Sequence, residues 1–155
     1  MSRATLSSEL QGLTPSGTEA DAIQKLTAAF AAYCEEAVAL TPILSAGIDL
    51  GVEAMEAELV GMNAPGAAAA KIAAGFQAFW NAVALGLATS FAGASAITPP
   101  SYAALPVMLQ GVFYANRDLG RTLEESADVM ATAIHVSTVP GGSVTTAGPA
   151  VTPIA

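Results

Sequence analysis

Charged side chains are scarce in this chain. They make up 12% of its 155 residues, whereas about 25% is typical of globular proteins. A monomer of this size needs more charge than this to cover its surface. We therefore expect a large part of its exterior to be covered by other subunits or by lipid.

Basic residues are scarcer than acidic ones. The chain has 5 Lys and Arg against 13 Asp and Glu, which gives a net charge of -8. Binding of nucleic acid depends on clustered Lys and Arg that neutralise phosphates. Because the basic residues are scattered along the sequence, we expect no direct contact with nucleic acid.

Cysteine and histidine occur once each, as Cys34 and His135. A single cysteine excludes a disulfide framework and a cysteine-based zinc site. Cys34 falls on the apolar face of a predicted helix, so we expect a buried, inert thiol. His135 falls near the end of another predicted helix, where an imidazole commonly serves the helix dipole or a carbonyl.

Catalytic signatures are also missing. The sequence has no glycine-rich phosphate loop and no nucleophile elbow. Asp49, Glu53 and Glu56 concentrate carboxylates on one predicted helix, but the Glu-x-x-His spacing of carboxylate-bridged metal bundles is lacking. A solvated helix face is the simpler interpretation. The sequence thus predicts a protein that is not an enzyme and that holds no cofactor and no metal.

No charged residue occurs between Lys71 and Arg117. The first part of this run predicts one long helix, at about residues 67–96, because large apolar side chains recur at steps of three and four. These side chains are Ile72, Phe76, Phe79, Val83, Leu87 and Phe91. Small residues that favour close helix packing form a second stripe, at Ala74, Ala78, Ala82 and Gly86. A helix that is apolar all round is expected to be buried at the centre of a bundle.

A membrane span is the alternative for this run, because about 20 apolar residues suffice to cross a bilayer. Gln77 and Asn81 oppose it, and no cluster of Lys or Arg flanks the run to set an orientation. We expect these two amides to bond a neighbouring helix, in this chain or in another copy. The N-terminal segment lacks the apolar core of a secretory signal, which predicts synthesis in a cytoplasm.

Helix start signals organise the rest of the chain. Thr18 is placed to cap a helix, and Thr122 with Glu125 forms a capping box. The helices predicted beside the central one are 18–40, 41–62, 106–116 and 122–136. We therefore expect a mainly α fold, a bundle of four to five helices around the central helix.

The domain organisation expected from these signals has three parts. Residues 18–136 form the helical domain. Residues 1–17 form a lead-in that docks through its leucines, which are Leu6, Leu10 and Leu13. Residues 137–155 form an extended β arm.

The arm is predicted from β-branched residues on both sides of a turn cluster. Val136–Val139 and Ser143–Thr146 predict two strands of a hairpin, with Pro140–Gly142 as the turn. A solitary hairpin is marginal in water, so we expect it to add to, or drape over, a neighbouring protein. The interface residues expected from this argument and from the central helix are Val139, Val144, Thr145, Thr146, Val151, Ile154, Gln77 and Asn81.

The last third of the chain resembles small virion proteins of tailed bacteriophages, in particular those of the head–tail connector, or neck, and of the tail. The resemblance is carried by the helix Ala127–His135, which continues into the Val-, Thr-, Gly- and Pro-rich segment Ser143–Pro149. It is one of overall texture and includes no diagnostic motif, so it assigns no functional residue. It implies repeated copies in a ring or lattice, with arms that lock neighbours together.

The expected function is therefore that of a non-enzymatic structural subunit of a large homo-oligomeric assembly. Its partners would be other copies of itself and other virion proteins, and its location would be the virion after synthesis in a host cytoplasm. One alternative is a cytoplasmic helical module that binds a partner helix or a small apolar ligand along the apolar seam Leu44–Met62. A membrane-embedded helical protein is the other alternative.

Overall fold

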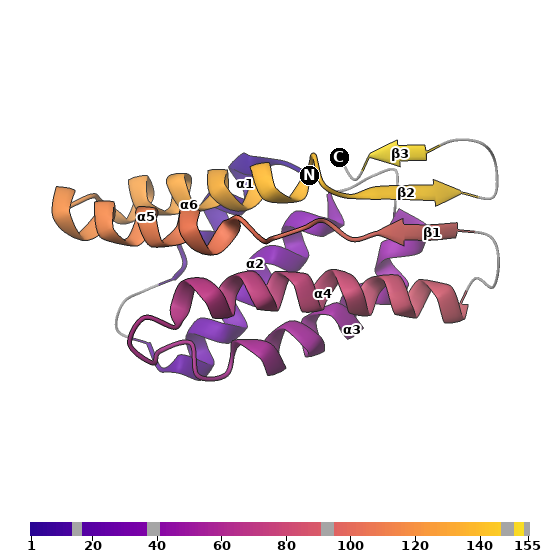
Figure 1. Cartoon of the computed structure of the whole chain (residues 1–155), viewed down its shortest axis with the longest axis horizontal. Helices are drawn as coiled ribbons and strands as arrows, with labels where there is room; N and C mark the ends of the chain where they lie inside the picture. Colours follow the sequence, from indigo (N-terminus) through magenta and orange to yellow (C-terminus); the bar gives the residue numbers. More distant parts are fainter. Residues whose placement is uncertain (14–16, 37–40, 91–94, 147–150, 154–155) are drawn as a thin grey trace.

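The protein is mainly helical, as the sequence predicts (Figure 1). The computed structural model describes residues 1–13, 17–36, 41–90, 95–146 and 151–153, and for 41–46, 87–90, 95–96, 144–146 and 151–153 it describes the backbone only. Six helices lie in these residues: α1 (Arg3–Leu10), α2 (Glu19–Glu35), α3 (Thr41–Leu59), α4 (Ala68–Ser90), α5 (Leu105–Leu119) and α6 (Leu123–Thr138). The capping residues predicted for α2 and α6 are confirmed, because the Thr18 side chain accepts from the Asp21 N–H and Thr122 with Glu125 forms the capping box.

The central helix is α4, and the part of its apolar stripe from Ile72 to Val83 is buried as predicted, whereas the side chains of Leu87 and Phe91 lie outside the described residues. Phe76, Phe79 and Val83 have no solvent exposure, and neither has Trp80. The predicted extension of this helix to residue 96 is wrong, because Ser95–Thr98 forms strand β1. β-branched Ile97 and Thr98 lead directly into Pro99, and a residue before proline is disfavoured in the α conformation.

Glycines on α3 and, at Gly86, on the predicted small stripe of α4 bring these two helices together: a Cβ added at Gly86 would lie 3.1 Å from Cδ1 of Leu50 and 3.9 Å from Cα of Gly47. A Cβ added at Gly51 would lie 2.7 Å from Cδ2 of Phe79, and one added at Gly47 would lie 3.3 Å from Cα of Val83. The small stripe that begins at Ala74 is only half-buried. The described inward residues of the apolar seam of α3, among them Met55 and Leu59, are buried in the core. Apart from half-buried Val52, the seam residues whose side chains are described therefore pack inside the chain, and the side chain of Leu44 lies outside the described ones.

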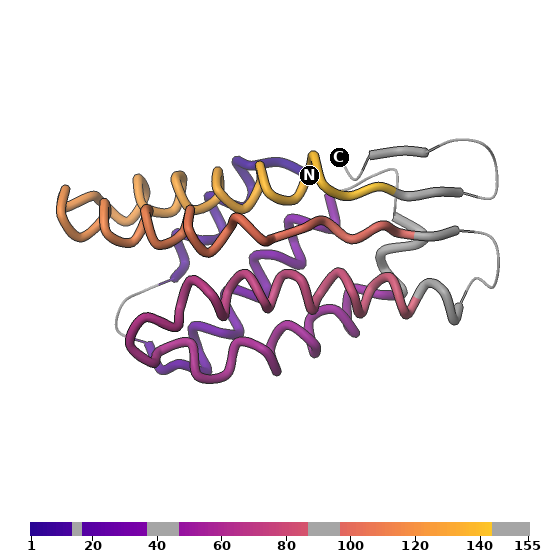
Figure 2. The backbone as a smooth tube through the Cα atoms, in the orientation of Figure 1, coloured from indigo at the N-terminus to yellow at the C-terminus, as the bar shows by residue number. Residues whose placement is uncertain are grey.

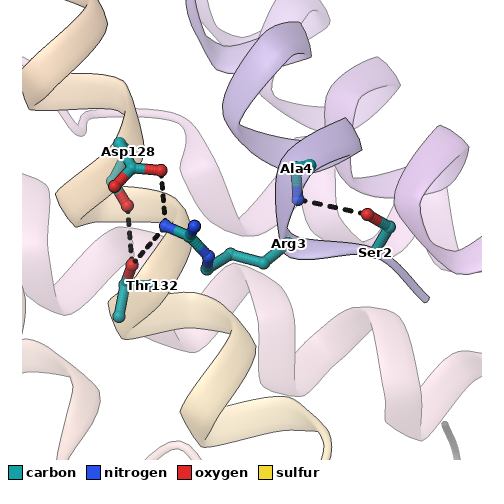
Figure 3. A network of polar contacts seen from close by, with 5 residues as sticks. All are labelled: Ser2, Arg3, Ala4, Asp128 and Thr132. Atoms are coloured by element: carbon teal, nitrogen blue, oxygen red, sulfur yellow. Dashed lines mark hydrogen bonds and ion pairs between the residues drawn. The ribbon is translucent and has the colours of Figure 1, made fainter.

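The predicted lead-in contains a helix, α1, that is part of the core. Leu6 and Leu10 are buried, which confirms docking through the leucines, and Leu13 is half-buried. Figure 3 shows Arg3 of α1 reaching α6, where its guanidinium bonds the Asp128 carboxylate and the Thr132 hydroxyl.

Glu36, at the end of α2, holds the other side of α1. Its carboxylate accepts from the Ser2 N–H at 2.7 Å and from the Thr5 hydroxyl at 2.6 Å. These two bonds lower the pKa of Glu36, the one from Thr5 more than the one from Ser2. α1 is therefore held on one side by Glu36 at the end of α2 and, through Arg3, on the other side by α6.

Short strands lie at one end of the molecule (Figure 1). β1 pairs with β2 (Ser143–Thr146), and β2 pairs with β3 (Val151–Pro153), both antiparallel, in the order β1-β2-β3. β2 is thus paired with β1 of its own chain, a pairing that the sequence argument did not include.

The predicted first strand of the hairpin, Val136–Val139, is wrong. Residues through Thr138 continue α6, and the Val139 N–H donates to the His135 carbonyl at 3.0 Å. The hydroxyls of Ser137 and Thr138 each donate to the carbonyl four residues earlier, at 2.9 and 2.8 Å. These bonds accommodate Ser and Thr in the last helical turn.

No helix in the described part of the chain is long and apolar enough to cross a bilayer. The amides Gln77 and Asn81, which opposed a span in the sequence, lie within α4.

Candidate interaction surface

One side of α4 faces solvent and carries no charge. Its residues recur at steps of three and four along the helix: Ala70, Ala74, Gln77, Asn81 and Leu85. Leu85 is 69% exposed. The Gln77 amide donates to Oδ1 of Asn81 at 3.2 Å. In this chain the two amides therefore bond each other at the surface, and not a neighbouring helix.

The solvent side of α5 is also uncharged from its start at Leu105 to Asn116. Val107 is 73% exposed and Tyr114 is 59% exposed. Met108 is 37% exposed, whereas Leu109 and Val112 are buried.

α5 is longer than the predicted 106–116. It ends at Leu119, where Gly120 adopts the left-handed conformation, with φ of 59°, that commonly ends a helix. The segment Arg117–Leu119, beyond the predicted end of this helix, is therefore helical.

The two uncharged helix sides lie next to each other, with α5 beside the first half of α4 (Figure 2). A shallow depression of about 330 Å³ lies between them, lined by Ala70, Ala73, Ala74, Gln77, Ser101, Tyr102, Ala103 and Pro106. A second one, of about 220 Å³, is lined by Gly66, Ala68, Ala69, Gln110, Phe113 and Tyr114. We call the continuous surface the α4–α5 face and define it by Ala70, Ala74, Gln77, Asn81, Leu85, Ala103, Val107, Gln110 and Tyr114.

All charged side chains of the chain lie among the described residues and outside this face. Lys71 borders it at one end, where its ammonium donates to the Glu58 carbonyl at 2.9 Å and lies 3.6 Å from that residue's carboxylate. Arg117 borders it at the other, over the Tyr114 ring at 5.2 Å and bonded to Asp118 at 2.8 Å. Most acidic residues project from the other helices, and Asp118 of α5 lies beyond the face beside Arg117, so most of the negative charge lies away from the α4–α5 face.

A chain of buried hydrogen bonds fixes the floor of the larger depression. The Trp80 indole N–H donates to the Tyr102 hydroxyl at 2.9 Å, and this hydroxyl lies 2.8 Å from the hydroxyl of Thr138. Because Thr138 donates to the Ile134 carbonyl, its oxygen accepts the Tyr102 proton. Burial raises the pKa of Tyr102 far above its usual value. One series of hydrogen bonds, from Trp80 through Tyr102 to Thr138, therefore joins α4 to the segment that precedes α5, and this segment to α6.

His135 and Cys34 have structural surroundings. The Tyr33 hydroxyl lies 2.7 Å from Nδ1 of His135, which joins α2 to α6. Burial, and then the charges of the chain's amino group and of Arg3, lower the pKa of His135. The lowered pKa favours the neutral imidazole, and its hydrogen bond with Tyr33 is a role that sequence reasoning did not identify. Cys34 is fully buried, as predicted, and burial raises the pKa of its thiol.

The described residues that were predicted to form an interface fall in three places. Gln77 and Asn81 lie on the α4–α5 face, and Val139 is half-buried after α6. Val144, Thr145 and Thr146 lie in β2, Val151 lies in β3, and Ile154 lies outside the described residues. The sheet register brings Thr145 opposite Val151.

Sequence reasoning missed the exposed residues of α5. Val107 and Tyr114 are the most exposed large side chains that this helix adds to the α4–α5 face. The one indication of them in the sequence is that, before Arg117, neither the buried nor the exposed side of this helix carries a charge. The apolar pattern alone does not separate Met108 from Leu109.

A separate apolar cavity of about 270 Å³ is lined by residues of α2, α4, α5 and α6. Its walls are Leu13, Ala22, Leu26, Met62, Ile72, Phe113 and Met130, with Asp21 and Lys25 at its edge. Lys25 lies 3.2 Å from the Asp21 carboxylate. The lining of the cavity is thus mainly apolar, and its two charged residues, Asp21 and Lys25, form an ion pair.

No group of His, Cys, Asp and Glu among the residues that the structure describes is arranged to hold a metal ion. Comparisons with protein families, with curated proteins and with solved structures found no match to this chain.

Proposed function

We propose that this protein is a non-enzymatic structural subunit of a large homo-oligomeric assembly, and that neighbouring subunits cover its α4–α5 face. The observation that carries the proposal is an exposed surface of two adjacent helices without one charged side chain, in a chain of net charge -8. Large uncharged apolar surfaces mark sites of protein contact.

Burial of this face is favourable because apolar area is removed from water. Each fully exposed large apolar side chain gains about 1.5–3 kcal/mol when buried, and Val107 and Tyr114 are more than half exposed. Tyr is among the residues enriched at the centres of interfaces, where its ring is buried and its hydroxyl finds a partner. The acidic helices would then face solvent and keep the assembly dispersed.

The kind of assembly we propose is a bacteriophage virion, with the chain in the neck, in the tail or on the capsid. Support comes from the texture of the last third of the sequence and from the low charge, since both suit a protein that is made in the host cytoplasm and then packed among repeated copies.

The C-terminal arm supplies a second proposed contact between neighbours. In the order β1-β2-β3, β3 is an edge strand within the described residues. An edge strand presents unpaired backbone N–H and C=O groups to which a strand of a neighbouring subunit can add.

Imaging of native particles from cells that make this chain tests the proposal. We expect many symmetric copies, with Val107 and Tyr114 covered by a neighbour. A chain that occurs in those cells only as an isolated molecule, with this face open, overturns it. The matched variants are Val107→Lys, which puts a charge on the face, and Val60→Lys, which puts one on another exposed valine, the residue that follows α3. Only the first should prevent incorporation.

A binding module for a small apolar ligand is the second candidate, favoured by the 270 Å³ cavity. The cavity is slightly smaller than typical ligand pockets of about 300–1,000 Å³. Ala22→Trp should fill it. This candidate predicts thermal stabilisation of the native chain, and not of the variant, by an added medium-chain alcohol; equal responses contradict it.

A further inference from the structure

We propose that the α4–α5 face binds the same face of a second copy across a two-fold axis that passes close to Gln77. This inference rests on the proposed function and gives the geometry of one contact in the assembly. It commits to one occupant, a second copy of this chain, and its grounds are the distribution of charge, the chemistry of the amides and the spacing of small residues on α4.

Charge decides between a two-fold contact and a head-to-tail contact. Every other helix exposes carboxylates: examples are Glu9 on α1, Glu35 on α2, Glu53 on α3 and Glu124 on α6. A head-to-tail contact would press such a surface against the uncharged face and remove carboxylates from water without a basic partner, which is costly. A two-fold contact places the α4–α5 face against itself and buries no carboxylate.

The polar groups on the face are self-complementary. Gln77, Asn81 and Gln110 carry carboxamides, each with a donor group and an acceptor oxygen. An amide can therefore pair with the same amide of a second copy, which neither a carboxylate nor an ammonium can do. The bond between Gln77 and Asn81 holds both amides in one orientation, so less side-chain freedom is lost when copies associate.

The position of the axis follows from the stripe on α4. The stripe begins at Ala70 and ends at Leu85, so its centre is at Gln77 and Ala78. Around a two-fold axis at this centre, two α4 helices run antiparallel, with Asn81 opposite Ala74 of the second copy. The small side chains of Ala74 and Ala78 let the helix axes approach to about 8 Å, the lower end of helix packing distances.

A charge swap at the axis tests this arrangement. In a two-fold contact, position 77 of one copy lies near position 77 of the other. Gln77→Glu alone and Gln77→Lys alone should each weaken self-association by about tenfold or more, because like charges then face each other. An equimolar mixture of the two variants should restore association, as heterodimers that contain one chain of each.

The matched control is Gln24, an exposed glutamine on α2. Gln24→Glu and Gln24→Lys change the net charge by the same amounts, so they should leave the dissociation constant within about twofold of the wild-type value. Sedimentation velocity on detergent-free protein gives the constants, and native mass spectrometry identifies the heterodimer.

The outcomes separate this inference from the proposed function. Association of the wild-type chain that is weakened by both Gln77 variants, but not restored in their mixture, overturns the two-fold contact and supports a head-to-tail assembly. Gln77 variants that associate as the wild type does also overturn it. A wild-type chain that is monomeric at all concentrations and yet repeats in native particles overturns the direct contact between copies and leaves the structural role in place.

Discussion

The indole N–H of Trp80 points to the hydroxyl of Tyr102 at 2.9 Å, and both side chains are buried. This bond crosses from the central helix to the segment before α5, so it sets the position of α5 against α4. Thr138 continues it to α6. The α4–α5 face therefore depends on a buried polar series beneath it.

Tyr102→Phe should destabilise the fold by about 1–3 kcal/mol, because the indole N–H and the Thr138 hydroxyl lose a buried partner. Chemical denaturation monitored by circular dichroism measures the loss. Tyr114→Phe removes a hydroxyl from an exposed tyrosine on the neighbouring helix and should change stability little. Equal effects of the two changes would contradict the role of the buried series.

Gly51 and Gly111 should respond in opposite directions to alanine. A Cβ at Gly51 would lie 2.7 Å from the Phe79 ring, whereas nothing lies within 4 Å of one at Gly111. Gly51→Ala should cost about 1–3 kcal/mol by overpacking. Gly111→Ala, in the interior of α5, should stabilise by about 0.5–1 kcal/mol through helix propensity. Thermal unfolding of both variants checks this, and a neutral Gly51→Ala would mean that α3 and α4 are farther apart.

Stability should fall as the pH is lowered from about 6.5, the usual pKa of histidine. Folding lowers the pKa of His135, so the unfolded chain binds this proton more tightly than the folded one, and acid favours unfolding. The contribution is fully present above the unfolded pKa and is lost as the pH falls through the lower folded one. His135→Gln should flatten this part of the stability–pH profile, and an unchanged slope between pH values of about 6.5 and 5 would refute the assignment.

Removal of residues 151–155 should leave the helical circular dichroism signal nearly unchanged, because β3 pairs only with β2 among the described residues. The shortened chain should still associate through the α4–α5 face but fail to enter the full assembly. Incorporation into particles, counted by mass spectrometry against wild-type protein in the same cells, is the measurement. Normal incorporation of the shortened chain would exclude a role of β3 as a lock.

The helices were the predictable part of the fold, because their signals are local. Thr18, and Thr122 with Glu125, mark helix starts through bonds made within one turn. The burial of Phe76 and Phe79 follows from their spacing on a helix that is apolar all round. The fold class and the core of α4 could therefore be predicted.

The elements that were missed depend on distant contacts. α1 is a short helix whose stability comes from Leu6 and Leu10 in the core and from Arg3 against α6, and short helices depend on such packing. β1 exists as a strand beside β2, which lies far along the sequence. Nothing in the sequence of either segment indicates that the two strands pair.

The candidate site was predictable in part for the same reason. The absence of charge between Lys71 and Arg117 is visible in the sequence, and so are the amides Gln77 and Asn81. Which residues of α5 face solvent depends on how the Tyr102 series sets that helix, so Val107 and Tyr114 could be identified only from the structure.

Light scattering of detergent-free protein over a range of concentrations shows whether copies of the chain associate through the α4–α5 face. We expect the mass of the wild-type protein to rise above that of one chain, 15.4 kDa, as concentration increases, while Val107→Lys stays at this mass and Val60→Lys behaves as the wild type does. If wild-type protein and Val107→Lys associated alike, the contact between copies would not involve the α4–α5 face, and the proposal would be refuted.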